Sequence, residues 1–453
     1  MGLLSRILNR TPEKPTAVRS YDAATASRTR FNAGQNRFSS YGPETIAANS
    51  SIRSRARHAA ENNALAVSAV SAWVDATIGA GMVPTSQHSD PDTRKALDAY
   101  FAKWAKRADA SGRGDFWSMQ SAIVKAQRID GEAFAMWRGD KLLQLPPEQI
   151  ADLTTDSIAA GVELNDDGAA IAFHVHPTRP DAIQATYAPP VRVDAADMMQ
   201  VFEPAGPGAV RGVSPLAPIL LALAELDSAE DALLTQTKIA ALLSVILTNE
   251  SDTATDDPLA DGQSLEPGAI LRLPGNWKVT AVAPQQSQQA GEFLRHLTHR
   301  IASGVGVPVW LVTSDVSQAN YSSLRAALVA FRQRVERYQF QTLVPQFLDP
   351  TWRRVATMAA LELGLEFTDE LFDVEFIPPA QPWVDPAKDA RATIEQMEAG
   401  LLSRRQAVAS LGYSIEKLDA EIAADRAREA ALGLSFSGPA QKQPNNQKAG
   451  DDE

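Results

Sequence analysis

One helix ends and another begins within the segment Ile301-Ala-Ser-Gly-Val-Gly-Val-Pro308-Val-Trp-Leu-Val-Thr-Ser-Asp315-Val-Ser-Gln-Ala-Asn320-Tyr-Ser-Ser-Leu-Arg325. Gly304 and Gly306 favour a helix end, Pro308 favours a turn, and Asn320 is typical of a helix start. The loop between them is small, polar and without an acid–base pair. Such a loop suits a surface past which another molecule slides.

The composition excludes several classes of protein. The chain has 453 residues, enough for two or three domains, and no cysteine. The absence of cysteine excludes disulfide scaffolds, thiolate zinc sites, iron–sulfur clusters and thiol nucleophiles. The longest apolar run, Ile239 to Leu247, is far shorter than the roughly 20 residues of a membrane-spanning helix. The N-terminus resembles neither a secretory signal nor a myristoylation site, so we expect a soluble protein.

Charge is unevenly distributed along the chain. Residues 1–57 contain ten Arg and Lys against three acids, a net charge of +7, so the remainder carries −19 of the total −12. A protein that holds DNA tightly is basic where it contacts the phosphates. The acidic bulk of this chain therefore argues against static DNA binding, but it is compatible with DNA moving along the surface.

The hydrophobic pattern predicts an α+β protein. We expect an extended arm over residues 1–50 and a low-complexity tail after Ser437. Predicted helices cover residues 50–80, 91–107, 116–130, 216–247, 291–303, 321–342, 350–364, 386–399, 403–411 and 414–432. Predicted strands cover residues 132–137, 141–145, 170–176, 191–202 and 373–377, with 268–273 and 277–282 as a pair. The helix over 216–247, about 45 Å long at 1.5 Å per residue, is much longer than the usual three turns.

Motifs for catalysis, cofactors and metals are weak. Neither nucleotide-binding glycine pattern is present, so the chain is not expected to be an ATPase. The pairs His174/His176 and His296/His299 could hold zinc only by joining distant regions, and surface histidines are the simpler interpretation. Ser414-Ile-Glu-Lys417 matches a Ser-x-x-Lys motif without its partner motifs, and Ser414 is better explained as an N-cap. Asp130-Gly-Glu132 is best interpreted as turn chemistry. We therefore expect no catalytic residue, cofactor or metal.

Five segments, in order along residues 50–433, resemble the lambda-type family of bacteriophage portal proteins. The opening segment resembles the family's "GVP … L … D.S..NYSS.R" block. Similar matches occur at Ser54-Arg-Ala-Arg57 with Glu61-Asn-Asn63 and Gly79-Ala-Gly81-Met-Val-Pro84, at Asp130-Gly-Glu132, at Gly208-Ala-Val-Arg211-Gly-Val-Ser-Pro-Leu-Ala-Pro218, and at Asp385-Pro-Ala-Lys388 with Gly400-Leu-Leu-Ser-Arg404. The sequence departs from the family at Ala64, where Pro is usual, and at Val210, where Gln is usual.

The resemblance implies a portal fold with wing, stem, clip and crown regions and long stem helices. By this analogy the regions are a basic arm (1–50), an α+β wing (51–225), a stem helix (226–248), a clip (249–290), a second stem helix (291–311), a tunnel loop (312–322), wing return helices and strand (323–385), a helical crown (386–433) and a disordered tail (434–453). Asp315, Ser317, Gln318 and Asn320 are the implied DNA-channel residues.

The resemblance also implies a biological role. Portal proteins form a ring of about twelve subunits at one capsid vertex of the virion, after assembly in the host cytoplasm. Double-stranded DNA is packaged through the ring by the terminase and later ejected. The implied partners are the terminase large subunit, head-completion proteins, and the major capsid and scaffold proteins. The alternatives are a soluble enzyme with an unmarked site, for which activity as a monomer would be diagnostic, and a DNA-binding regulator, which the acidic charge disfavours.

Overall fold

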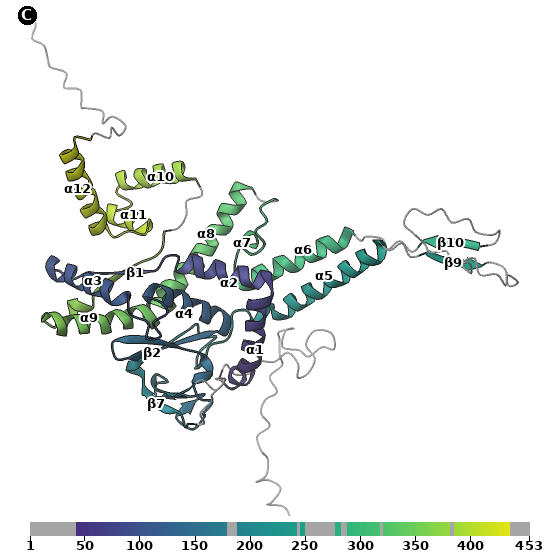
Figure 1. Cartoon of the computed structure of the whole chain (residues 1–453), viewed down its shortest axis with the longest axis horizontal. Helices are drawn as coiled ribbons and strands as arrows, with labels where there is room; N and C mark the ends of the chain where they lie inside the picture. Colours follow the sequence, from purple (N-terminus) through teal and green to yellow (C-terminus); the bar gives the residue numbers. More distant parts are fainter. Residues whose placement is uncertain are drawn as a thin grey trace, which may run out of the picture.

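A wide body and a two-helix stalk make up most of the molecule (Figure 1). The computed structural model describes residues 42–178, 188–241, 245–249, 277–281, 288–317, 320–380 and 385–434. Within these ranges the chain is a mixed α+β protein, as the hydrophobic pattern predicts. None of the helices in the described ranges combines the length and the apolar character that crossing a membrane would require.

Two helices, α1 (Pro43–Asn62) and α2 (Ala64–Thr77), occupy the region predicted as one helix over 50–80. The break is at Asn63, whose side-chain oxygen accepts hydrogen bonds from the backbone N–H groups of Leu65 and Ala66 and so caps α2. Helix α1 begins at Pro43, within the range expected to be an extended arm. Residues 1–41 of that arm lie outside the described residues.

Capping residues mark the start of the next two helices and the end of the second. Helix α3 (Pro91–Ala105) begins after Asp90, and α4 (Phe116–Asp130) has a capping box formed by Asp115 and Ser118. Gly131 adopts a left-handed conformation, with φ of 89°, and ends α4. The chain then enters a strand directly, so Asp130 and Glu132 lie on either side of a sharp turn.

Two small antiparallel sheets and one strand pair complete the body. The three-stranded sheet has the order β3–β2–β8, and the four-stranded sheet has the order β4–β5–β6–β7. The strands are β2 (Glu132–Arg138), β3 (Lys141–Leu145), β4 (Ile158–Ala159), β5 (Val162–Leu164), β6 (Ala170–Val175), β7 (Val191–Asp194) and β8 (Met198–Phe202), and β1 (Val83–Ser86) pairs with β11 (Val374–Ile377).

The single strand predicted over 191–202 is two strands in different sheets. Asp194 accepts a hydrogen bond from the N–H of Ala196, and a short 3-10 turn, η3 (Ala195–Asp197), separates β7 from β8. The local turn chemistry of Asp194 therefore outweighs the apolar alternation on either side.

Aromatic side chains from distant segments form the centre of the body. Phe101, Trp104, Phe116, Phe347 and Trp352 are all buried. The rings of Phe116 and Phe347 stack with centroids 5.7 Å apart, and Trp352 lies 5.5 Å from Phe101. This cluster joins α3 and α4 to the later helices, so the return segment belongs to the same core as the first half of the chain.

A continuous helical segment follows the candidate loop. Helix α8 (Tyr321–Tyr338) leads into the π-helical η5 (Gln339–Leu348) and then into α9 (Asp349–Leu363). We expected two separate helices, 321–342 and 350–364. Pro345 lies inside η5, and its missing N–H is tolerated because a wider π turn shifts the hydrogen-bonding pattern.

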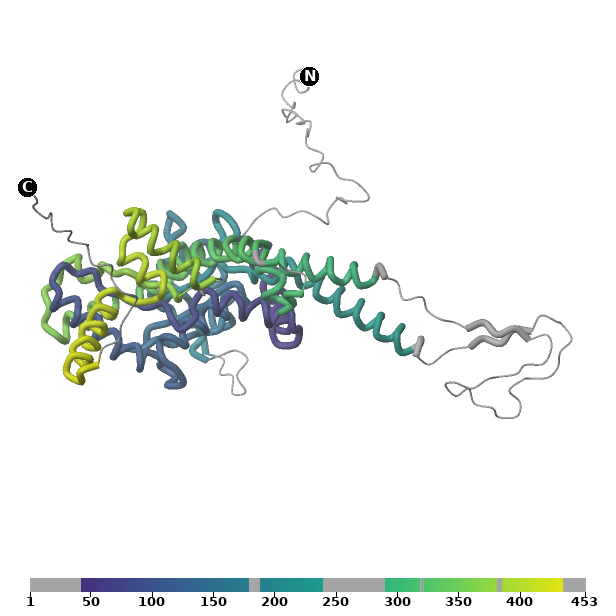
Figure 2. Tube along the Cα trace, turned by 90° about the horizontal axis from the view of Figure 1, so that it is seen from above, coloured from purple at the N-terminus to yellow at the C-terminus, as the bar shows by residue number. Residues whose placement is uncertain are grey.

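The stalk consists of α5 (Leu220–Ala241), which follows the short η4 (Ala217–Ile219), and α6 (Gln288–Val305). Figure 2 shows the pair extending side by side away from the body. The helix predicted over 216–247 is too long, because residues from Val245 onward form β9 (Val245–Asn249), which pairs with β10 (Trp277–Ala281). The strand expected over 268–273 lies outside the described residues.

Three helices follow β11: α10 (Pro386–Glu398), α11 (Arg404–Ser410) and α12 (Ile415–Leu432). They lie above the body at the side away from the stalk tip (Figure 1). Ser403 and Gln406 form the predicted capping box. Ser414 occupies the N-cap position of α12, but its hydroxyl donates to Glu416 rather than capping the backbone. The tail beyond residue 434 lies outside the described residues.

Candidate functional site

Two glycines lie where the chain passes from the stalk to the candidate loop. A Cβ on Gly304 would lie 2.4 Å from Cγ2 of Ile219, so α6 approaches η4 closely at this point. Gly306 has φ of 73°, and its carbonyl oxygen accepts a hydrogen bond of 2.9 Å from Nη1 of Arg334 on α8. The end of α6 is thereby attached to both the stalk base and α8.

A short helix that the sequence does not predict lies within the opening segment. Pro308 precedes α7 (Val309–Thr313), and Ser314 ends it in a left-handed conformation with φ of 58°. Val312 is buried. Residues 291–311, expected as one helix, therefore contain the end of α6, a turn and the start of α7, and α7 continues to Thr313, within the range expected as a loop. The apolar run Val309 to Val312 forms a helix because it packs against α2.

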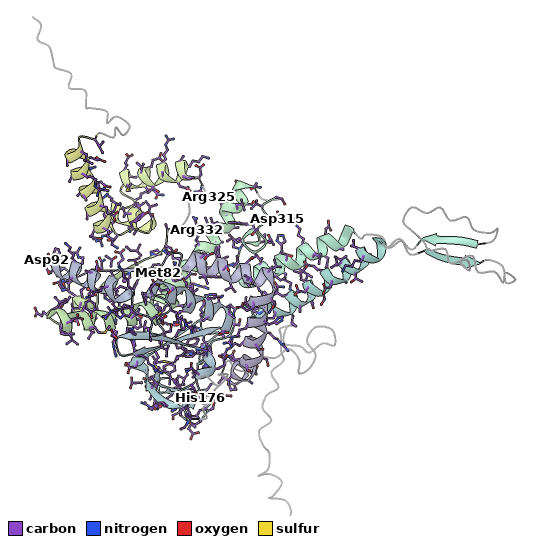
Figure 3. All side chains as sticks on the ribbon, in the orientation of Figure 1. Met82, Asp92, His176, Asp315, Arg325 and Arg332 are labelled. Carbon is purple, nitrogen blue, oxygen red and sulfur yellow. The ribbon has the colours of Figure 1, made fainter. Side chains whose placement is uncertain are left out.

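The polar loop is held by its own side chains. Asp315 Oδ1 accepts a hydrogen bond of 2.9 Å from the N–H of Ser317, and the N–H of Asp315 donates to Oγ1 of Thr313. Hydrogen bonds from Ser317 and the positive charge of Arg295 hold the pKa of Asp315 below its usual value. Asp315 is exposed and presents a negative charge to solvent (Figure 3).

Asn320 has a structural role at the other end of the loop. Its side-chain oxygen accepts a hydrogen bond of 2.9 Å from the N–H of Ser323, and the Ser323 hydroxyl accepts one of 3.2 Å from the N–H of Asn320. This reciprocal pair starts α8, as the sequence predicts. The structure thus brings Asp315 and Ser317 together and uses Asn320 as a cap, whereas Gln318 lies outside the described residues.

Replacing Asn320 by alanine is expected to destabilise the first turn of α8 by about 1 kcal/mol. The change removes the acceptor for the N–H of Ser323. Hydrogen exchange of the backbone amides at Ser323 and Leu324 is expected to become severalfold faster. Ser317→Ala, three positions earlier in the chain, is the control and leaves those amides unchanged. Equal protection in Asn320→Ala and wild type would show that the cap contributes nothing.

Arg325, near the loop on α8, is engaged within the chain. Nη2 of Arg325 lies 3.3 Å from Oδ1 of Asp389 on α10. Burial lowers the pKa of Arg332, as does the charge of Arg325, and Asp389 opposes this effect. Figure 3 shows Asp315, Arg325 and Arg332 around α7 and α8. Pairing with Asp389 reduces the positive charge that Arg325 presents beside the loop.

A cavity of about 690 Å³ lies beside α7. Helices α2, α7 and α8 line it together with residues 379–380 and 411–413. Trp310, Leu328 and Phe331 supply apolar surface, and Arg332 supplies a charged group. The cavity therefore lies at the junction between α7, the body and the C-terminal helices.

A buried charged cluster, which we name the glutamate joint, is the strongest polar feature of the body. It comprises Arg53, Glu132 and Arg211. Glu132 is fully buried and accepts hydrogen bonds from Nη2 of Arg53 at 3.0 Å and from Nε of Arg211 at 2.9 Å. Burial lowers the pKa of Arg211, but the charge and hydrogen bonding of Glu132 outweigh it and raise this pKa overall.

A second set of ion pairs borders the glutamate joint. Arg57 donates two hydrogen bonds of 2.7 Å to the carboxylate of Asp130 and a third of 3.1 Å to Glu148. These bonds, first that to Asp130, raise the pKa of Arg57. The acids flanking Gly131, interpreted from sequence as turn chemistry alone, therefore also hold α1 against α4 and β2. The spacing of Arg53 and Arg57, one helical turn apart, was the available signal for this arrangement.

His174, the member of its histidine pair that lies on β6, is engaged with a neighbouring carboxylate. His174 Nε2 lies 3.4 Å from Glu163, a surface carboxylate that also binds Arg192. Among the residues that the structure describes, no group of three or more His, Cys, Asp or Glu side chains could hold a metal ion.

Comparison with known proteins identifies the chain's family. It belongs to the lambda family of phage portal proteins, because the model of "Phage portal protein, lambda family" matches residues 28–339, more than half of the chain. This family is structural rather than catalytic. The resemblance deduced from the five sequence segments is therefore confirmed.

Individual relatives are distant in sequence. The "Probable portal protein" of Halomonas phage phiHAP-1 is 23% identical over 385 residues, which cover 77% of this chain and 73% of the relative. The solved structure "Virion of native gene transfer agent (GTA) particle" contains a chain with 16% identity and a TM-score of 0.49, covering 90% of this chain and 97% of that one. A chain of "Neck of native GTA particle computed with C12 symmetry" has 18% identity and a TM-score of 0.49, covering 87% of this chain and 95% of that one.

Proposed function

We propose that about twelve copies of this chain form a closed ring at one vertex of a capsid. The terminase drives double-stranded DNA inward through the ring, and the same passage later serves ejection toward the tail. One observation carries this proposal. The chain belongs to the portal family, and its α5–α6 stalk projects from the body with an exposed polar loop at the base.

Each region of the proposed portal corresponds to a set of helices and strands. Helices α5 and α6 form the stem, and the β9–β10 pair belongs to the clip, which contacts the terminase large subunit and later head-completion proteins. Helices α10 to α12 form the crown. The body, from α1 to β8 with α8 to β11, forms the wing, which contacts capsid and scaffold proteins.

The α7–α8 loop lines the channel in this proposal, through Asp315, Ser317, Gln318 and Asn320. A conduit must release its cargo at every step, and each Arg or Lys on a phosphate strengthens the hold that motion must break. The acidic Asp315 beside small polar groups makes only weak, exchangeable contacts with phosphates. The overall charge of −12 favours passage in the same way.

Light scattering and negative-stain imaging of the purified protein test the assembly. Rings near twelve subunits, with a central hole wide enough for a DNA duplex, are the expected result. A protein that stays monomeric, or that closes without such a hole, would refute the proposal. Catalytic activity of the monomer would favour the enzyme alternative instead.

Replacing Gln318 by arginine is expected to slow DNA packaging about tenfold or to stall it. Twelve added cations around the bore would contact phosphates together, and each contact weakens release. Packaging into empty capsids, measured as nuclease-protected DNA over time, reports the effect, which is expected to lessen as the salt concentration rises. Gln341→Arg is the matched control, because Gln341 is exposed and lies about 30 Å along the helical path from the loop. Packaging at the wild-type rate in Gln318→Arg would remove this loop from the channel.

A further inference from the structure

The stalk carries an acidic stripe on α5. Asp227, Glu230, Asp231 and Leu234 are all exposed, and Leu234 is 53% exposed. Their spacing of three, four and seven residues puts them on one face of the helix. We name these four residues the acidic stripe. The stripe therefore combines three carboxylates with one exposed apolar side chain.

A complementary stripe lies on α6. Phe293, His296 and Arg300 are exposed, with Phe293 at 56% exposure, and they recur at a spacing of three and seven residues. We name them the basic stripe. Like the acidic stripe, it combines polar side chains with one exposed apolar residue. Its polar side chains are basic rather than acidic.

Packing within the subunit leaves both stripes uncovered. Helices α5 and α6 contact each other, and Leu226 and Leu297, which lie outside both stripes, are buried. Among the residues that the structure describes, Glu230, Asp231 and Arg300 form no ion pair, and Asp227 accepts hydrogen bonds only from the amide of Asn63. The stalk extends beyond the body along most of its length (Figure 2), so within the described residues the body provides a partner to Asp227 alone of the two stripes.

We propose that the acidic stripe of one subunit packs against the basic stripe of the next copy. This interface rests on the proposed ring. A ring closed by rotation needs a heterologous contact, with two different and complementary patches on every subunit. The two stripes meet this requirement, since they differ in charge, lie on different helices and each carry an exposed apolar residue. Leu234 and Phe293 then leave water at the interface, and Glu230 and Asp231 face Arg300 and His296.

Charge reversal tests the pairing. The first variant carries Glu230→Lys with Asp231→Lys, and the second carries His296→Glu with Arg300→Glu. Each variant alone places like charges together, so the concentration at which half of the subunits are in rings is expected to rise about tenfold. An equimolar mixture restores rings at the wild-type concentration. In a ring where the two variants alternate, altered stripes face altered stripes and unaltered stripes face unaltered ones, so every interface pairs opposite charges. One chain carrying all four substitutions also restores them.

A matched control distinguishes the effect of the stripe from the effect of the total charge. Glu225→Lys with Glu366→Lys changes the net charge as much as the first variant does, at exposed positions outside the stripes, and it is expected to assemble as the wild type does. Wild-type assembly by both single-stripe variants, or no restoration in the mixture and in the fourfold variant, would overturn the interface. A wild-type chain that forms no ring would instead refute the proposed function. Circular dichroism and thermal unfolding verify that each variant folds.

Discussion

Replacing Glu132 by alanine is expected to lower the free energy of unfolding by about 3–5 kcal/mol. The substitution deletes a fully buried carboxylate and leaves Arg53 and Arg211, both buried, without their shared counter-charge. It also removes the acceptor for the N–H of Gly212. Urea-induced unfolding of the isolated subunit, followed by tryptophan fluorescence, measures the change.

Two other substitutions provide the comparison for the loss of stability in Glu132→Ala. Glu163→Ala breaks the exposed pair with Arg192 and is expected to leave the urea midpoint nearly unchanged, because solvent screens exposed ion pairs. Glu132→Gln keeps the volume and one acceptor oxygen, so it falls between Glu132→Ala and the wild type. If Glu132→Ala were no more destabilising than Glu163→Ala, the glutamate joint would not hold the body together.

Helices bounded by local chemistry could be predicted from sequence almost to the residue. Helix α4 begins at the capping box of Asp115 and ends at the left-handed Gly131, and α11 begins at the box of Ser403. These signals act between residues three or four positions apart, so the sequence alone contains both partners. The start of α8 at Asn320 follows the same rule.

Elements that depend on distant partners could not be predicted in this way. Val245 to Asn249 continues the apolar pattern of α5, yet it is a strand because Trp277 to Ala281 pairs with it. The apolar residues of α7 look like the edge of a loop until α2 is placed beside them. Tertiary contacts decide both cases.

The candidate site likewise has a part that the sequence predicts and a part that it does not. The polar character of the α7–α8 loop is visible in the sequence, as is the family resemblance. The spacing of Arg53 and Arg57 is visible too, but their partners are not. Arg53 and Arg211 are each 79 positions from Glu132, and the three residues of the glutamate joint meet only after α1, β2 and the segment before η4 pack together. Three of the five family-like segments contain residues of this joint or its flanking ion pairs. Their physical role is therefore to hold the body together rather than to perform chemistry.

Replacing Gly131 by alanine is expected to destabilise the subunit by about 3–4 kcal/mol. Gly131 has φ of 89°, and a Cβ there would lie 2.2 Å from the carbonyl carbon of Val213, a backbone atom that cannot rotate away. Gly139→Ala is the control, because Gly139 also has a positive φ, 65°, but open space around its Cα; only the conformational cost of about 1–2 kcal/mol remains. Urea unfolding of both variants measures the difference. Equal losses of stability would mean that the two backbones can separate freely, and the close approach of Gly131 to Val213 would then not be needed to hold the glutamate joint.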